Sequence, residues 1–362
     1  MENKDAIKLV KFKDLNLEDP FFDSLRDDYE GFNDWFKRKA LSNSNAYVLF
    51  KSDGMLQAFL YLKRERDEDT TISPSLPQCN KLKVGTFKVE AHKTSLGQRF
   101  MNIIVQALIR YHFDLTYVTF YPKQVQLKNL FKKYGFEKWG MKNNEEVYYK
   151  DLKVKNNTFK DFPRINEKRL VNKFLLGIYP KYHTELFPDS KLCNEKDFVR
   201  KDISFSNSII KCYLGGMEEM SNFKPNDLIA IYRTKDNWAD SAFYNSVVTS
   251  VCTVIDTRNI NDFTDFSSFK KYVGKETIFS EQELKRFYET KRYPYIVKML
   301  YNFPLNKRIT NGELRTKLNI ALDYWGCAEL NNNQFNAILK YGGIRYCSCI
   351  CNQAYRKGCG RI

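Results

Sequence analysis

The 362-residue sequence contains no apolar run that approaches the roughly 20 residues needed to cross a lipid bilayer. Residues 1–5 mix charges of both signs and no apolar segment follows them, so no secretory signal is expected and a cytoplasmic location is predicted. No internal repeat or low-complexity block is present, and aromatic residues make up 15% of the chain. This composition favours well-packed, sheet-rich domains over disorder.

The number of cysteines is odd, so they cannot all pair in disulfides within one chain. The nine cysteines are interpreted as free thiols, because the chain is expected to remain in a reducing compartment. The last four are Cys347, Cys349, Cys351 and Cys359, and alternation along an extended segment would place the first three on one face. Four thiolates can bind zinc, but this spacing differs from the usual Cys-x2-Cys pattern. We therefore predict no metal site and keep zinc as the alternative.

Acidic residues are scarce relative to basic ones, mainly in the second half. The chain carries 59 Lys/Arg and 43 Asp/Glu, a net charge of +16. Residues 1–152 have a net charge of +4 and residues 153–362 have a net charge of +12. A basic excess of this size is typical of proteins that bind a polyanion, most often nucleic acid. The alternative is a solvated, lysine-rich surface.

The length exceeds what one hydrophobic core usually fills, so two domains are expected. Residues 153–163 are polar and end in proline, which predicts a linker between a domain at 1–152 and a second domain at 164–362. Apolar periodicity in the first domain predicts helices at 28–41, 96–111 and 127–134, and strands at 46–50, 55–62, 82–89, 115–120 and 146–152. In the second domain, a helical stretch at 167–176 and strands at 209–214, 228–233 and 246–256 predict a small mixed barrel with helical elaborations.

The strand expected at 82–89 is followed by a loop and a helix. Backbone N–H groups in such a loop, together with the first turn of the helix, form a positive cradle for phosphate. Lys93 and Arg99 would add charge, while small residues would let a pyrophosphate approach the backbone. The sequence alone therefore indicates a phosphate-binding loop in the first domain.

This loop resembles the signature of the GNAT superfamily, Gln/Arg-x-x-Gly-x-Gly/Ala between a strand and a helix. His92 stands at the Gln/Arg position, Ser95 at the first glycine and Gly97 at the second. Residues 130–136 read Leu-Phe-Lys-Lys-Tyr-Gly-Phe, similar to the family's Leu-Tyr-Glu-Lys-Leu-Gly-Phe. The resemblance covers about residues 1–152, and the ordered set of elements is more specific than the loop alone.

The resemblance implies that acetyl-CoA is the co-substrate and that its pyrophosphate binds at the loop. A backbone N–H near Val89 would polarise the thioester carbonyl. The residues expected to bind acetyl-CoA are Phe87, Lys88, Val89, Lys93, Thr94, Ser95, Leu96, Gly97, Gln98 and Arg99.

The catalytic groups depart from the family pattern. The usual general-acid tyrosine falls at Phe131, which has no proton to donate. Tyr134, one turn later, and Tyr121, after the preceding strand, are the candidates to replace it. Glu90, at the mouth of the strand, is the candidate base that would deprotonate the amine. The alternatives are that Glu90 only solvates a loop and that Tyr134 only packs.

In the second half, the turn Lys-Pro-Asn-Asp at 224–227 leads into a hydrophobic strand, and this segment resembles PUA-like domains, especially the ASCH type. Asn226 replaces the family's glycine, and asparagine tolerates the positive φ of such a turn. The resemblance covers about residues 207–304 and implies an RNA or modified nucleic-acid partner. Arg233, Lys235 and Trp238 are the predicted nucleic-acid-binding residues, through phosphate contacts and base stacking. The alternative is that Trp238 packs on the barrel.

These observations predict an α/β (α+β) chain in which a GNAT-like mixed sheet with helices precedes a PUA-like β-barrel domain. The predicted function is acetyl-CoA-dependent N-acetylation of an amine, on an RNA such as tRNA that the second domain recruits. The alternatives are a protein or small-molecule N-acetyltransferase, and a non-catalytic nucleic-acid-binding regulator on a GNAT scaffold. No membrane partner is expected, and the sequence leaves the oligomeric state open.

Overall fold

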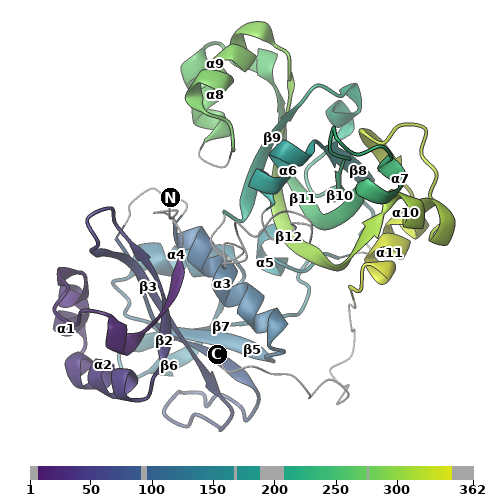
Figure 1. The fold of residues 1–362 in the computed structure, drawn as a ribbon. Coiled ribbons are helices and arrows are strands. Elements are labelled where there is room, and N and C mark those ends of the chain that lie inside the picture. Colours follow the sequence, from purple (N-terminus) through teal and green to yellow (C-terminus); the bar gives the residue numbers. More distant parts are fainter. Residues whose placement is uncertain (1–6, 91–95, 167–168, 188–207, 275–276, 345–362) are drawn as a thin grey trace. The chain divides into compact units, whose positions relative to one another are not determined.

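A computed structural model describes residues 7–90, 96–166, 169–187, 208–274 and 277–344 (Figure 1). The described residues divide into two compact units, one that ends at Lys153 and one that begins at Val154. The stretch expected to be a linker, 153–163, contains the short helix α5 (Thr158–Asp161) and belongs almost entirely to the second unit.

The first unit is built on a seven-stranded mixed sheet with the strand order β1-β2-β3-β4-β5-β7-β6. Strands β4 and β5 run parallel, and the other described neighbours are antiparallel. The strands are β1 (Lys8–Lys11), β2 (Asn45–Phe50), β3 (Leu56–Glu65), β4 (Lys81–Val89), β5 (Leu115–Phe120), β6 (Glu137–Lys142) and β7 (Glu145–Asp151). The five strands predicted in this half are confirmed, with small shifts at their ends.

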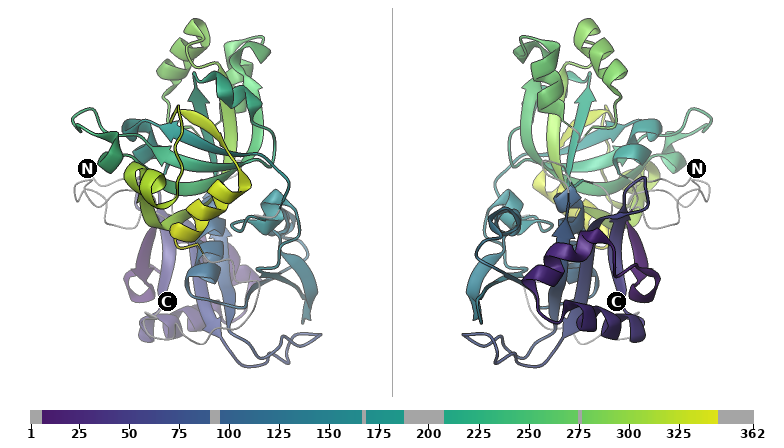
Figure 2. Two further views of the ribbon diagram at one scale, coloured as in Figure 1. Left: turned by 90° about the vertical axis from the view of Figure 1, so that its right-hand side faces the viewer. Right: turned by 90° about the vertical axis from the view of Figure 1, so that its left-hand side faces the viewer.

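Helices cover both faces of this sheet (Figures 1 and 2). Phe59 and Tyr61 of β3 pack against the face that α1 (Asp23–Asp28) and α2 (Phe32–Leu41) cover. Because side chains alternate along a strand, Leu60 and its cross-strand neighbour Phe87 face the other way. There Phe87 meets a phenylalanine of α3 (Leu96–Arg110) and one of α4 (Val125–Lys133).

The structure corrects two predicted helices. The helix expected at 28–41 begins only at Phe32. Gly31 has a φ of 78°, a left-handed conformation that a right-handed helix cannot include. The helix expected at 167–176 is wrong in its last residues, where strand β8 (Lys173–Ile178) is buried at every position. A short apolar run that is buried on both faces has no alternation by which a strand can be told from a helix.

The second unit contains a six-stranded mixed sheet with the strand order β13-β8-β10-β11-β12-β9. Strands β8 and β10 run parallel, and the other described neighbours are antiparallel. The remaining strands are β9 (Ile210–Gly215), β10 (Leu228–Arg233), β11 (Val247–Asn259), β12 (Tyr295–Thr310) and β13 (Cys327–Leu330). The predicted mixed α/β fold is confirmed. In the part of the chain that the structure describes, β13 and β9 stay separate edges, so this sheet does not close into the expected barrel.

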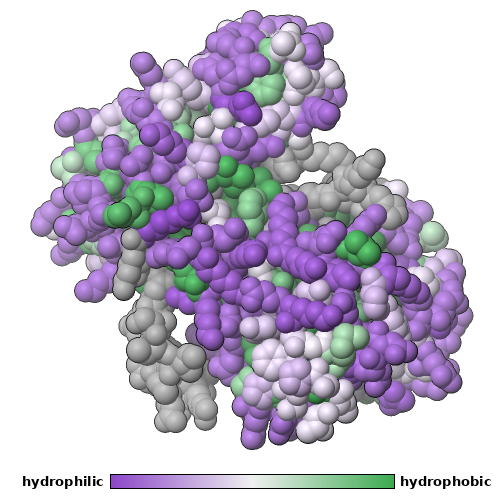
Figure 3. Space-filling view, turned by 180° about the vertical axis from the view of Figure 1, so that it is seen from behind, coloured by the Kyte–Doolittle hydropathy of each residue, from purple (hydrophilic) through white to green (hydrophobic). Residues whose placement is uncertain are grey.

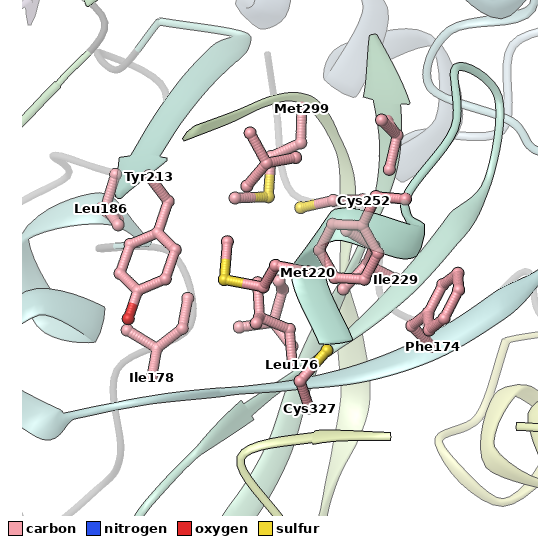
Figure 4. Packing of buried hydrophobic residues seen from close by; sticks show 14 of the residues in the cluster. Phe174, Leu176, Ile178, Leu186, Tyr213, Met220, Ile229, Cys252, Met299 and Cys327 are labelled. Atoms are coloured by element: carbon pink, nitrogen blue, oxygen red, sulfur yellow. The ribbon is translucent and has the colours of Figure 1, made fainter. Parts of the chain in front are cut away.

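Two apolar cores lie on opposite faces of the second sheet. Figure 4 shows one of them, in which Leu176 and Ile229 from neighbouring strands meet Met220 and Met299. The other core includes Leu175 and side chains of α11 (Asn332–Tyr341). The other described helices of this unit are α6 (Pro180–Leu186), α7 (Ala242–Asn245), α8 (Phe266–Val273), α9 (Glu281–Thr290) and α10 (Asn311–Lys317). Hydrophilic residues dominate the face shown in Figure 3, where apolar residues form only small groups.

Candidate functional site

Strands β4 and β5 of the first unit diverge toward their carboxyl ends. Their parallel pairing stops at Val84 and Val118, although both strands continue beyond these residues. Gly85 marks the departure, because the β3–β4 register shifts there and an extra residue bends β4. A Cβ at Gly85 would lie 2.7 Å from the Tyr61 ring, so only glycine fits. Ligands of open α/β sheets bind outside the carboxyl ends of parallel strands, which makes this end the candidate site.

The divergence leaves two N–H groups of β4 facing the side where β5 no longer pairs. The Glu90 N–H donates to the Gln57 carbonyl oxygen at 2.9 Å. Hydrogen-bonded and non-hydrogen-bonded pairs alternate in an antiparallel ladder, so the backbone of Lys88 also faces β3. The N–H groups of Phe87 and Val89 therefore point in the opposite direction. Donors at alternate positions of one strand edge can hold an extended ligand as an added strand is held.

Glu90 follows β4 directly and lies between two lysines. Its carboxylate is 3.5 Å from the Lys51 ammonium and 3.3 Å from the Lys88 ammonium, and 35% of its side chain is exposed. The Lys88 ammonium also donates to the Phe21 carbonyl oxygen and to Ser24 Oγ at the start of α1. This geometry suits both the predicted base and a carboxylate that only pairs with lysines, so the catalytic role stays a prediction.

The two candidate acids lie in different environments. The Tyr121 hydroxyl donates to the Asp28 carbonyl oxygen at 3.2 Å, so α1 runs from the end of β4 to the end of β5. Tyr121 is half-buried, whereas Tyr134 is completely buried. A leaving thiolate would reach Tyr134 only if neighbouring side chains moved. Phe131 is also completely buried and packs edge-on against Phe120, so it has a packing role.

The predicted phosphate loop lies only partly within the described residues. Lys93, Thr94 and Ser95 are outside them, whereas Leu96, Gly97, Gln98 and Arg99 form the first turn of α3. The N–H groups and the dipole at the start of a helix of this length favour an anion. A Cβ at Gly97 would lie 3.0 Å from Leu130 Cδ2 of α4, so this position is also closely packed.

In the second unit, the turn that precedes β10 has the geometry predicted from the sequence. Asn226 has a φ of 81°, which confirms that asparagine replaces the expected glycine in a left-handed conformation. Its Oδ1 accepts hydrogen bonds from Thr158 Oγ1 at 2.6 Å and from Arg169 Nη1 at 3.2 Å. Burial raises the pKa of Asp227, although its carboxylate accepts two backbone N–H bonds. A hollow of about 250 Å³ lies beside the turn and is lined by Asn156, Asn157, Thr158, Phe159, Arg169, Pro225, Asn226, Val254 and Ile255.

The three predicted nucleic-acid contacts follow one another at the end of β10. Arg233 is only 3% exposed, and its Nη2 donates to both carboxylate oxygens of Asp236 at 3.1 and 3.0 Å. Lys235 Nζ donates to the Ala239 carbonyl oxygen at 2.7 Å. Trp238 is 75% exposed, so its ring is available to a partner instead of packing in the core. A phosphate would have to displace Asp236 to contact Arg233.

A buried histidine of α6, which sequence analysis did not single out, lies next to a bulge in β11. Thr249 is the extra residue of this bulge in the pairing with β10, and His183 Nε2 is 2.8 Å from its hydroxyl oxygen. The Thr249 hydroxyl also lies within hydrogen-bond distance of the Ile231 carbonyl oxygen, at 3.3 Å, so the His183 ring is tied to β10 through Thr249. His183 Nδ1 has no hydrogen-bond partner among the described residues. Burial, and then the nearby Arg233 and Arg308, lower the pKa of His183 to about 3.

This histidine predicts a loss of stability in acid. The pKa of His183 is about 6.5 in the unfolded chain and about 3 in the folded chain, so between these pH values only the unfolded chain is protonated at this residue. The free energy of unfolding therefore falls as the pH falls through this window. The slope from one proton is about 1.4 kcal/mol per pH unit. We expect His183→Gln to flatten the pH dependence measured by urea unfolding, and the matched control His112→Gln to leave it unchanged. Parallel profiles for all three proteins would contradict the assignment.

Among the described residues, no group of three or more potential metal ligands occurs. The closely spaced cysteines Cys347, Cys349, Cys351 and Cys359 lie outside those residues. None of the helices within the described ranges combines the length and apolar character that a membrane crossing requires.

No family model matches the sequence, and no curated protein matches it. Solved structures that resemble parts of the chain include the N-acetyltransferase PseH from Campylobacter jejuni, which is 13% identical over 41% of this chain and 99% of that chain, with a TM-score of 0.27. They also include ASCH from Zymomonas mobilis, 11% identical over 48% of this chain and 96% of that chain, with a TM-score of 0.30. A GNAT family acetyltransferase from Listeria monocytogenes is 19% identical over 34% of this chain and 72% of that chain, with a TM-score of 0.27. Each similarity spans less than half of this chain and is too weak to carry a functional conclusion.

Proposed function

We propose that the chain is an acetyl-CoA-dependent N-acetyltransferase, and that its basic second unit binds an RNA that carries the acceptor amine. The observation that supports the transferase most directly is the divergence of β4 and β5 beyond Val84 and Val118. The N–H groups of Phe87 and Val89 point to the side that this divergence opens, and α3 begins at Leu96, a few residues after β4. An extended, anionic ligand such as acetyl-CoA fits donors along a strand edge and at a helix start.

In this proposal acetyl-CoA supplies an activated acetyl group, and the residues of the chain orient it and move protons. Glu90 takes a proton from the acceptor ammonium. The free amine attacks the thioester carbonyl carbon and the C–N bond forms. The C–S bond then breaks, and the nitrogen releases its remaining extra proton to water to give the neutral amide. The Val89 N–H stabilises the oxygen on which negative charge develops. The leaving thiolate takes a proton from Tyr121 or Tyr134, or from water.

The RNA partner is supported by the charge of residues 153–362, with 34 Lys/Arg and 22 Asp/Glu. Lysine and arginine that neutralise phosphates supply most of the sequence-independent affinity for nucleic acid. The exposed ring of Trp238 adds a surface on which an unpaired base can stack. A tRNA, whose amines occur on bases and on an attached amino acid, is the proposed substrate.

The test is mass spectrometry of RNA and protein after incubation with isotopically labelled acetyl-CoA. We expect label on an RNA amine, and we expect that nuclease treatment of the RNA beforehand abolishes it. Label on a protein or on a small molecule alone would favour the acceptor classes that the sequence left open. Acetyl-CoA binding without transfer to any acceptor would identify a non-catalytic regulator.

A further inference from the structure

Exposed aromatic rings gather at one end of the second sheet. Four of the described aromatic side chains are strongly exposed: Trp238 at 75%, Tyr244 at 73%, Tyr179 at 65% and Tyr324 at 51%. All four belong to the second unit, and no aromatic residue of the described first unit is exposed to this degree. Since tyrosine and tryptophan normally bury most of their rings, such a group marks an interaction surface.

The strand directions place these four residues at the same end. Tyr179 follows β8 and Trp238 follows β10, and these strands are parallel, with Ile178 opposite Arg233. Tyr244 precedes β11 and Tyr324 precedes β13, and these strands run antiparallel to β10 and β8. The carboxyl ends of the first pair therefore coincide with the amino ends of the second pair.

The rings also follow adjacent strands. The four strands are neighbours in the order β13, β8, β10, β11, which spans roughly 14 Å at the usual spacing between strands. In the β8–β13 pairing, Leu176 lies opposite Cys327, and continuing this register brings Tyr179 opposite Tyr324. Burial, Glu219 and then the Tyr179 phenol raise the pKa of Tyr324, which agrees with two neighbouring phenols. A Cβ at Gly326 would lie 2.3 Å from the Tyr324 ring. Because glycine has no Cβ, the ring can lie against the backbone at this position.

Charge at this end is mixed rather than uniformly positive. Arg233 and Lys235 are present, but Asp236 pairs with Arg233, and Asp240 and Asp323 are exposed nearby in sequence. A surface that bound duplex phosphates alone would need an excess of cations. Rings without a dominant charge instead suit the faces of unpaired bases, which stack on aromatic side chains with little dependence on sequence.

We propose that Tyr179, Tyr324, Trp238 and Tyr244 form a stacking platform for single-stranded RNA. This inference rests on the proposed RNA-binding function and specifies the form of RNA that the second unit recognises. Bases in a duplex are stacked on one another and expose only their edges, so the platform excludes double-stranded segments and selects a loop or an open end. The basic surface of the same unit supplies the remaining, sequence-independent affinity.

The test measures binding of a single-stranded oligonucleotide and of a duplex of the same length to the full chain, by fluorescence anisotropy. Matched variants separate ring stacking from bulk: Tyr179→Phe and Trp238→Phe keep an aromatic face, whereas Tyr179→Leu and Trp238→Leu keep apolar bulk without one. We expect the leucine variants to weaken single-strand binding by roughly 5- to 100-fold each, and the phenylalanine variants to stay within a few-fold of the wild type. The duplex should bind more weakly than the single strand, and its affinity should be the same for the wild type and all four variants.

Several outcomes would overturn the inference. Equal binding of single strand and duplex, unaffected by the leucine variants, would remove the platform while leaving RNA binding intact. Self-association that the leucine variants abolish, measured by sedimentation, would reassign the surface to a second copy of this chain. Absence of RNA binding at low salt would remove the RNA partner and the platform together. Because the substituted side chains are exposed, unchanged thermal midpoints should show that every variant is folded.

Discussion

Replacing Gly97 by glutamate is expected to abolish acetyl-CoA binding. Gly97 is the second residue of α3, and a carboxylate there would put negative charge where the helix start is proposed to hold the pyrophosphate. Isothermal titration calorimetry with acetyl-CoA should show binding to the wild type and none to Gly97→Glu.

The control for this variant is Gly97→Ala. A Cβ at this position would come within 3.0 Å of Leu130 Cδ2, so any substitution disturbs the contact between α3 and α4. Alanine introduces that contact without charge or length, and we expect it to retain most of the affinity. If Gly97→Glu bound acetyl-CoA as tightly as the wild type, the phosphate would lie elsewhere. If the wild type itself failed to bind acetyl-CoA, the transferase proposal would be lost.

The second large effect is expected for Glu90→Gln. If Glu90 removes the proton from the acceptor amine, the amide should lower kcat by about 10²- to 10⁴-fold, the usual contribution of a general base. The KM for acetyl-CoA should change little, because the loss concerns an interaction made in the transition state. Steady-state kinetics at saturating acceptor measure both quantities.

Lys51→Gln is the matched control, since it removes one partner of the Glu90 carboxylate and leaves the carboxylate in place. We expect that variant to retain most of its activity. Equal and small effects of the two substitutions would show that Glu90 serves the ion pairs with Lys51 and Lys88, as the alternative interpretation holds. The proton would then leave through another group or directly to water.

Local patterns in the sequence predicted most of the first sheet correctly. Strand β4 alternates Leu82 and Val84 with Lys83 and Gly85, and α3 has an apolar stripe at helical spacing, so each signal is contained within one element. The positive φ of Asn226 was predictable for the same reason, because it depends on the residue type and on its immediate neighbours. The strand β8 was missed because its six residues are buried on both faces. Their side chains therefore show no alternation of apolar and polar residues by which a strand could be recognised.

The candidate sites depend on relations that no local pattern contains. The sequence by itself determined the strand that ends at Val89 and the helix from Leu96, the basic excess of the second half and the aromatic residues available for stacking. Only the tertiary structure decided that β4 and β5 diverge, because the bulge at Gly85 is defined against β3. Only the fold buries Arg233 against Asp236 while leaving Trp238 exposed five residues later, and only strand pairing brings Tyr179 to the same end as Tyr324. Burial and strand pairing are set by residues distant along the chain, so the sequence supplies the chemical groups and the fold determines which of them meet.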